Sequence, residues 1–158
     1  MKKSTAIFIA LFLLLYPALA QACYGPREFE AEQGIRIHSE LMVIGLSCIK
    51  MPEGETLYQK YQSFTAQNAN LIAGYETDLI NYYGREGVSE PELKLHELRT
   101  NMANEMSRRA IAMSISSFCQ KYSSHIDQAL AMNQQKIRRW AQHKWPNQPT
   151  SEPTCSKI

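Results

Sequence analysis

Residues 37–48 of this 158-residue chain read IHSELMVIGLSC, and their pattern of apolar residues indicates the fold class. Ile37, Leu41, Ile44 and Cys48 are spaced by four, three and four residues, which places them on one face of a helix. Similar spacing recurs along most of the chain, whereas no apolar run alternates with the period of two that is typical of a half-buried strand. The sequence therefore predicts an all-helical protein.

Three more apolar stripes follow along the chain. The second runs from Leu57 to Tyr82, the third begins at the helix-start signal Ser89-Glu90-Pro91-Glu92, and the fourth runs from Ile115 to Trp140. Four amphipathic helices with short connections are typical of an up-down-up-down antiparallel bundle, which we predict for residues 23–145 as one helical domain. Residues 146–158 contain three prolines and are predicted to form an extended tail that is tied back through Cys155.

One helix boundary stays open, because no Gly or Pro lies between residues 108 and 118. The third and fourth segments could form one bent helix of roughly 50 residues, which is much longer than is common in a globular domain. We therefore expect a turn near residues 110–116, where Ser114, Ser116 and Ser117 are the candidates for breaking or capping a helix.

The first 22 residues have the pattern of a cleaved secretory signal peptide. Lys2 and Lys3 precede an apolar run at residues 7–15, and Pro17 is followed by the small-residue segment Ala18-Leu19-Ala20-Gln21-Ala22. The apolar run is shorter than the roughly 20 residues that a membrane-spanning helix needs. We expect cleavage before Gln21 or before Cys23, and export to the periplasm of a Gram-negative cell or secretion.

Four cysteines follow the signal, and an even number in an exported chain is typical of disulfide bonds. Among the three possible connectivities, the bundle favours Cys48 with Cys119 and Cys23 with Cys155, because each pair then lies at one end. This inference fails if the third and fourth helices are continuous. A lipid anchor at Cys23 is the less favoured alternative, because Ala20 replaces the usual larger aliphatic residue and one thiol would be left unpaired.

Charge and motifs argue against several function classes. Removing Lys2 and Lys3 from the 17 basic residues leaves 15 against 15 acidic ones, so net charge gives no reason to expect nucleic acid or an anionic membrane as a partner. The sequence has no Cys-x-x-Cys, Gly-x-Ser-x-Gly, Gly-rich phosphate loop or His-Glu-x-x-His motif. We therefore expect no enzyme activity, no cofactor and no stable membrane span.

The second helix carries the candidate partner-binding residues. They are Tyr58, Tyr61, Tyr75, Tyr82 and Tyr83. The apolar body and polar tip of tyrosine suit a half-exposed protein interface, although packing inside the bundle is the simpler alternative. The basic segment from Lys136 to Lys144, with Trp140 and Trp145 beside it, could contact a membrane surface or an acidic partner, or it could only complement the helix dipole.

Metal handling is the alternative function class. Met102, Met106 and His96 lie close in sequence on the third helix, and thioethers bind copper(I). Methionines at helical spacing are more often core residues, however, and none of the histidines belongs to a Glu-x-x-His pair of the di-iron type. The sequence therefore predicts no resident metal, and copper handling stays the alternative to partner binding.

Several short motifs occur in a recognisable order along the chain. They are Ser39-Glu40-Leu41-Met42, Leu46-Ser47-Cys48, Asn101-Met102-Ala103-Asn104-Glu105 and Phe118-Cys119. With the aromatic-rich middle helix they resemble a group of uncharacterised small exported all-helical proteins of alphaproteobacteria, over residues 37–120. The resemblance supports the pair Cys48–Cys119 and implies no catalytic residue. We expect a periplasmic, non-catalytic binding or interaction module whose partner is another envelope protein.

Overall fold

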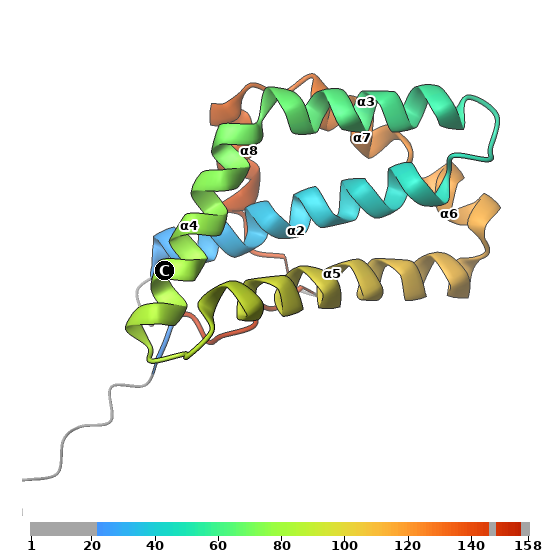
Figure 1. The fold of residues 1–158 in the computed structure, drawn as a ribbon. Coiled ribbons are helices and arrows are strands. Elements are labelled where there is room, and N and C mark those ends of the chain that lie inside the picture. Colours follow the sequence, from blue (N-terminus) through green and yellow to red (C-terminus); the bar gives the residue numbers. More distant parts are fainter. Residues whose placement is uncertain (1–21, 146–147, 156–158) are drawn as a thin grey trace, which may run out of the picture.

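The computed structural model describes residues 22–145 and 148–155 (Figure 1). The helices are α2 (Pro26–Ser47), α3 (Gly54–Gln67), α4 (Ala69–Arg85), α5 (Pro91–Met113), α6 (Ile115–Tyr122), α7 (Ser124–Leu130) and α8 (Gln134–Ala141). The predicted all-helical class is confirmed. The predicted signal peptide lies outside the described residues except for Ala22, and so do residues 146–147 and 156–158 of the predicted tail. Within the described ranges, no helix is both long enough and apolar enough to cross a membrane.

Helix α2 is the centre of the fold, because every other helix from α3 to α8 packs against it. Its apolar residues point in several directions rather than along one stripe, and Ile35, Leu41, Val43 and Ile44 are all buried. A helix with buried apolar residues on several sides is expected to be largely surrounded by protein. The consequence is that polar residues of the same helix, among them Glu32, are buried as well.

The expected second helix is divided into α3 and α4, which meet at a steep angle in Figure 1. Asn68 separates them and is buried. Its side-chain Nδ2 donates a hydrogen bond to the Phe64 carbonyl at 2.9 Å, a carbonyl that also accepts from the Asn68 backbone N–H at 3.1 Å. Asparagine competes in this way with the backbone pattern of a helix, which accounts for the bend.

The turn expected near residues 110–116 is confirmed, because α5 ends at Met113 and α6 begins at Ile115. Ser114 lies between them with a φ of 72°, and its Oγ accepts a hydrogen bond from the Ser117 N–H. Within the helix-start signal Ser89-Glu90-Pro91-Glu92, α5 begins at Pro91, and its N-cap residue is Glu90 rather than Ser89. The expected fourth helix is divided into α6, α7 and α8, so the predicted four-helix up-down-up-down topology is not confirmed.

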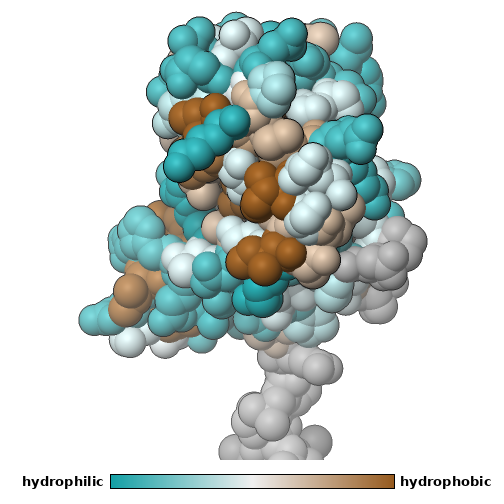
Figure 2. Space-filling view, turned by 90° about the vertical axis from the view of Figure 1, so that its right-hand side faces the viewer, coloured by the Kyte–Doolittle hydropathy of each residue, from teal (hydrophilic) through white to brown (hydrophobic). Residues whose placement is uncertain are grey.

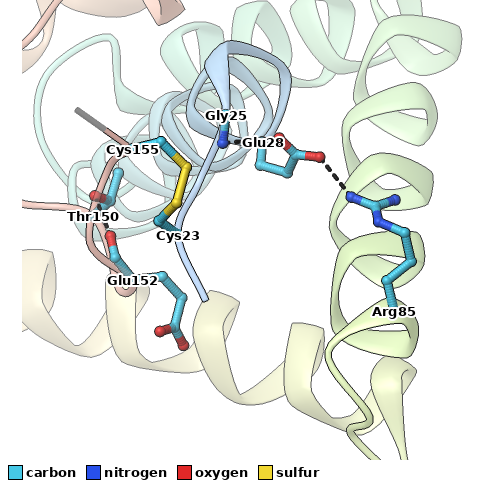
Figure 3. The surroundings of a disulfide bond; sticks show 7 residues. All are labelled: Cys23, Gly25, Glu28, Arg85, Thr150, Glu152 and Cys155. Carbon is cyan, nitrogen blue, oxygen red and sulfur yellow. Dashed lines mark hydrogen bonds and ion pairs between the residues drawn. A yellow bond between two sulfur atoms is a disulfide. The ribbon is translucent and has the colours of Figure 1, made fainter. Parts of the chain in front are cut away.

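The disulfides are those that the sequence favoured. Cys48 is bonded to Cys119 with Cα atoms 5.6 Å apart, and Cys23 is bonded to Cys155 with Cα atoms 5.1 Å apart. The first pair is buried, whereas the second is partly exposed beside the start of α2 (Figure 3). Because the sulfur of Cys23 is engaged in this bond, it cannot at the same time carry a lipid.

The C-terminal residues 148–155 return along α2 and are fixed to it by hydrogen bonds. Glu40 accepts from Gln148 Nε2 at 3.0 Å, and Arg36 Nη2 donates to the Pro149 carbonyl at 3.1 Å. The bond from Tyr24 N–H to the Pro153 carbonyl, at 2.8 Å, fixes the end of this segment. The segment therefore closes over a polar side of α2 that the helices leave open.

The start of α2 is also fixed to α4. The Glu28 carboxylate accepts from the Gly25 N–H at 3.1 Å and from Arg85 Nη2 at 2.7 Å, as Figure 3 shows. At the opposite end of α2, where α5 passes into α6, hydrophobic side chains gather on the surface among hydrophilic ones (Figure 2). Exposed hydrophobic residues of these elements are Leu46, Ile111 and Ile115.

Candidate functional site

The structure corrects the expected tyrosine-rich surface. Tyr61, Tyr75, Tyr82 and Tyr83 are buried, and only Tyr58 is partly exposed. The physical reason is that the stripe they form is the side of α3 and α4 that packs against α2, so the rings fill the core. These tyrosines do not form an accessible face.

Most of these hydroxyl groups have polar partners inside the protein. Tyr75 Oη donates to Glu30 Oε1 at 3.1 Å, and the Tyr83 hydroxyl lies 3.2 Å from that of Tyr24. The Tyr61 hydroxyl lies 3.3 Å from His38 Nε2. The polar tips that suggested an interface therefore serve the interior, as buried tyrosines usually require.

The three residues proposed to handle copper are separated. Met102 and Met106 are buried in the core, whereas His96 is exposed. His96 instead lines a surface pocket of about 400 Å³ between α2 and α5, together with His38 and Met42. Among the described residues, no group of three or more His, Cys, Asp or Glu side chains is placed to hold a metal ion.

A different group of residues forms the candidate site, a cleft between α2 and the C-terminal third of the chain. We call it the Trp140 cleft, and its volume is about 110 Å³. The residues that line it are Gln33, Arg36, Ile37, Glu40, Arg109, Tyr122, His125, Trp140, Trp145 and Gln148. The four from α2 follow the spacing i, i+3, i+4 and i+7, so one side of that helix forms the floor.

Two buried N–H groups of residues that line the cleft have no hydrogen-bond partner in the described part of the chain. They are Nε2 of Gln33, a residue that is only 2% exposed, and Nε of Arg36. Buried donors are almost always paired in folded proteins, and each unpaired one costs about 1–3 kcal/mol. Both residues line the cleft, so an acceptor bound there could satisfy these donors once the two side chains turn toward it.

The two arginines of the cleft are paired with carboxylates of residues that do not line it. Arg36 forms ion pairs with Glu32 at 3.5 Å and with Glu105 at 3.4 Å. Arg109 pairs with the same Glu105 at 3.2 Å. Burial raises the pKa of the Glu40 carboxyl, while the nearby Arg36 and Arg109 oppose that effect. Glu40 thus supplies acceptor oxygens on the same side of α2 as the donors.

Aromatic rings form the outer wall. Trp140 is partly buried, whereas Trp145 is 41% exposed and its ring lies edge-on to that of His143 with centroids 4.7 Å apart. Tyr122 stands between Phe118 and His125, at centroid distances of 4.9 and 5.4 Å. These contacts hold the rings in place, and burial lowers the pKa of His125, which favours a neutral imidazole.

One residue of the basic segment, Arg138, is engaged in contacts within the protein. Arg138 pairs with Glu30 at 2.7 Å, and its guanidinium lies 5.9 Å from the centre of the Tyr75 ring. Trp140 and Trp145, which the sequence placed beside this segment, line the cleft instead. The chain contains only these two tryptophans, so its tryptophan fluorescence reports on the cleft alone.

The sequence interpretation missed the polar floor of the cleft. The pattern of residues 37–48 shows one apolar stripe, and Gln33, Arg36 and Glu40 were not predicted as site residues. A signal was available, because Ile35, Met42 and Val43 place apolar residues on the remaining sides of the same helix. A helix that is apolar all round is buried, and its polar residues are then candidates for a site.

Comparisons with known proteins add no assignment to this geometry. No protein-family model matches the chain, and neither the curated proteins nor the solved structures compared with it give a match.

Proposed function

We propose that the protein is an exported, non-catalytic binding module that holds a small ligand in the Trp140 cleft. The signal-like residues 1–22 and two disulfide bonds support an oxidising compartment, either the periplasm of a Gram-negative cell or the cell exterior. The resemblance to small exported proteins of alphaproteobacteria supports the same location. The aromatic wall and the polar floor support binding rather than catalysis, because no nucleophile paired with a base lines the described cleft.

The observation that carries this proposal is the pair of unpartnered donors on α2. Gln33 Nε2 and Arg36 Nε are buried at the floor of a cleft, although leucine at position 33 would have filled the same space without a polar cost. A protein that keeps such groups sacrifices stability at that position, which is a common property of binding sites. A ligand with acceptor atoms recovers that loss when it binds.

The test compares the wild-type protein with Gln33→Leu in a screen by tryptophan fluorescence. The probes are amino acids, organic acids, neutral sugars, nucleosides and quaternary amines, each at millimolar concentration. We expect at least one compound to change the emission of the wild-type protein and to leave Gln33→Leu unchanged. In the absence of ligand, Gln33→Leu is expected to unfold at an equal or higher urea concentration, because an unpartnered amide has been removed.

Gln62→Leu is the matched control, because Gln62 is an exposed residue of α3 outside the cleft. It should respond to ligands as the wild-type protein does. The proposal is wrong if no compound class changes the wild-type emission, or if Gln33→Leu responds with the same affinity as the wild-type protein.

Docking of another envelope protein is a second candidate function, favoured by the exposed apolar residues at the α5–α6 end (Figure 2). Ile111 is 75% exposed, which is unusual for so large an apolar side chain. A photo-crosslinking amino acid at position 111 should capture a defined periplasmic protein that the same group at the exposed position Thr77 does not. Equal labelling from both positions would exclude a specific interface at this end.

A further inference from the structure

The polar groups of the Trp140 cleft require a ligand that can both donate and accept hydrogen bonds. Gln33 Nε2 and Arg36 Nε are unpartnered donors and need acceptor atoms. Glu40 offers carboxyl oxygens, of which Oε1 already accepts from Gln148 Nε2 at 3.0 Å. A ligand with hydrogen-bond acceptors only would leave the oxygens of Glu40 without a donor. A ligand with donors only would leave Gln33 Nε2 without an acceptor. Hydroxyl groups both donate and accept.

The charges around the cleft argue against an ionic ligand. Arg36 and Arg109 would attract an anion if they were free, but Glu105 lies within 3.4 Å of both, and Glu32 lies 3.5 Å from Arg36. An anion would have to compete with these carboxylates. A quaternary amine would be attracted by the aromatic rings but repelled by the guanidinium groups of Arg36 and Arg109, which also line the cleft. The cleft therefore favours a neutral ligand over an anion or a cation.

The aromatic wall adds a requirement for a flat apolar surface on the ligand. Trp140, Trp145 and Tyr122 line the cleft together with the polar residues of its floor. A ligand that fits both the aromatic wall and the polar floor carries C–H groups on one side and hydroxyl groups around its edge. Among neutral small molecules, the rings of sugars have this division, with axial C–H groups on a face and equatorial hydroxyl groups at the rim.

The size of the cleft limits the ligand further. Its volume of about 110 Å³ is well below the roughly 300–1,000 Å³ of pockets that enclose drug-sized ligands. One ring, or the end ring of a longer chain, is therefore the largest unit that it can receive. The exposed position of Trp145 leaves the mouth open, so further rings could extend into solvent.

We infer that the Trp140 cleft binds a neutral sugar ring, either free or at the end of a longer saccharide. This inference rests on the proposed function and names its ligand class. In the bound state Gln33 and Arg36 donate to ring hydroxyls, Glu40 accepts from one, and the indole of Trp140 covers the C–H face.

The test titrates the full mature chain with glucose, galactose, mannose and N-acetylglucosamine, with tryptophan emission as the signal and calorimetry as the second readout. Glucuronate, acetate, phosphate, tetramethylammonium and indole serve as comparison probes. We expect at least one of the four neutral sugars to bind at millimolar or lower concentration, and at least tenfold more tightly than any comparison probe.

Variants link the binding to the cleft. Trp140→Ala should weaken sugar binding at least tenfold by calorimetry, and Trp140→Phe should weaken it less because a flat ring remains. Gln33→Leu keeps the aromatic wall and should also weaken binding, so the result does not depend on the folding of one variant. Gln62→Ala, at an exposed position of α3 outside the cleft, is the control and should bind like the wild-type protein.

The possible failures are distinguishable. If a comparison probe or another compound of the wider screen binds in the cleft while all four sugars do not, the sugar inference is wrong and the binding function stands. If glucuronate binds as tightly as the best neutral sugar, the preference for a neutral ring is wrong. If no compound of any class changes the tryptophan emission, both the inference and the proposed function are wrong.

Discussion

The carboxylate of Glu32, which is fully buried in the central helix, is bound by Ser151 from the other end of the chain. Its two oxygens accept from the Ser151 N–H at 2.9 and 3.1 Å, and Oε2 also accepts from Ser151 Oγ. A buried carboxylate is tolerated only where such donors surround it. Glu32 is therefore one of the groups that hold the C-terminal segment against α2.

Replacing Glu32 with alanine should destabilise the protein strongly. The change leaves the Ser151 N–H without an acceptor and removes one of the ion-pair partners of Arg36, so we expect a loss of about 3–5 kcal/mol in the free energy of unfolding. Urea unfolding followed by circular dichroism measures it. Glu55→Ala, at an exposed position of α3, should stay within about 0.5 kcal/mol of the wild-type protein, and an equal effect of the two substitutions would contradict this role.

The two disulfides should differ in their accessibility to reductant. Cys48 and Cys119 are 1% and 5% exposed, whereas Cys23 and Cys155 are partly exposed. Thiol–disulfide exchange requires that the attacking thiolate reach the sulfur. Dithiothreitol under native conditions should therefore reduce the bond Cys23–Cys155 first, with Cys48–Cys119 reduced only when the protein unfolds. Alkylation of the released thiols and peptide mass spectrometry gives the order, and simultaneous reduction of both bonds would refute it.

Two buried tyrosines provide a matched test of the polar interior. The Tyr24 hydroxyl contacts the Tyr83 hydroxyl at 3.2 Å and Ser151 Oγ at 3.1 Å, whereas the buried Tyr82 hydroxyl has no partner among the described residues. We expect Tyr24→Phe to lower the free energy of unfolding by about 1–3 kcal/mol, and Tyr82→Phe to leave it unchanged or raised. Denaturant titrations of the two variants measure both values. The reverse order would show that the hydroxyls of this cluster are paired differently.

The sequence was sufficient for the helical class, because that class depends on spacing along the chain. The cysteine pairs are also those expected, although the four-helix topology from which they were inferred is not confirmed. Ile37, Leu41 and Ile44 mark a helix whatever surrounds it, and the turn at Ser114 keeps Cys119 within reach of Cys48. The bend at Asn68 was less accessible, since it depends on a side chain that bonds to the Phe64 carbonyl rather than to solvent.

The site was harder to predict because its parts meet only in the folded chain. Gln33 and Trp140 are separated by 107 positions, and neither belongs to a motif. The predicted tyrosine-rich interface was wrong for a related reason. Tyrosines such as Tyr61 and Tyr75 suit a half-exposed surface, but their hydroxyls bond to His38 and Glu30 within the protein. A periodic pattern identifies the side of a helix that is buried, and it does not identify which polar groups are buried with it.

The stability of the protein should fall below neutral pH because of His38. Burial, with a smaller contribution from nearby Arg99, lowers the pKa of His38 to about 4. The unfolded chain, with a histidine pKa near 6.5, binds this proton more readily, so the stabilisation is present above pH 6.5 and is lost as the pH falls towards 4. Between pH 7.5 and 5 we expect a loss of about 2 kcal/mol from this residue.

The measurement is urea unfolding at both pH values for the wild-type protein and for His38→Gln. The variant should lose most of this pH dependence, since glutamine can still bond to the hydroxyls of Tyr61 and Thr65 without titrating. His96→Gln, at an exposed position, should retain the wild-type profile. An unchanged pH dependence in His38→Gln would assign the effect to other groups.

Close packing of α4 on α2 depends on the absence of a side chain at Gly34. A Cβ atom there would lie 2.2 Å from Cε2 of the buried Tyr75 ring, much closer than atoms in contact can approach. We expect Gly34→Ala to lower the free energy of unfolding by about 1–3 kcal/mol, because the ring or the helix must move. Gly74→Ala is the matched control: a Cβ there meets nothing within 4 Å, so the better helix propensity of alanine should stabilise the protein by about 0.5–1 kcal/mol. Urea titrations of both variants should give opposite signs, and a stabilising Gly34→Ala would show that α2 and α4 are not packed this closely.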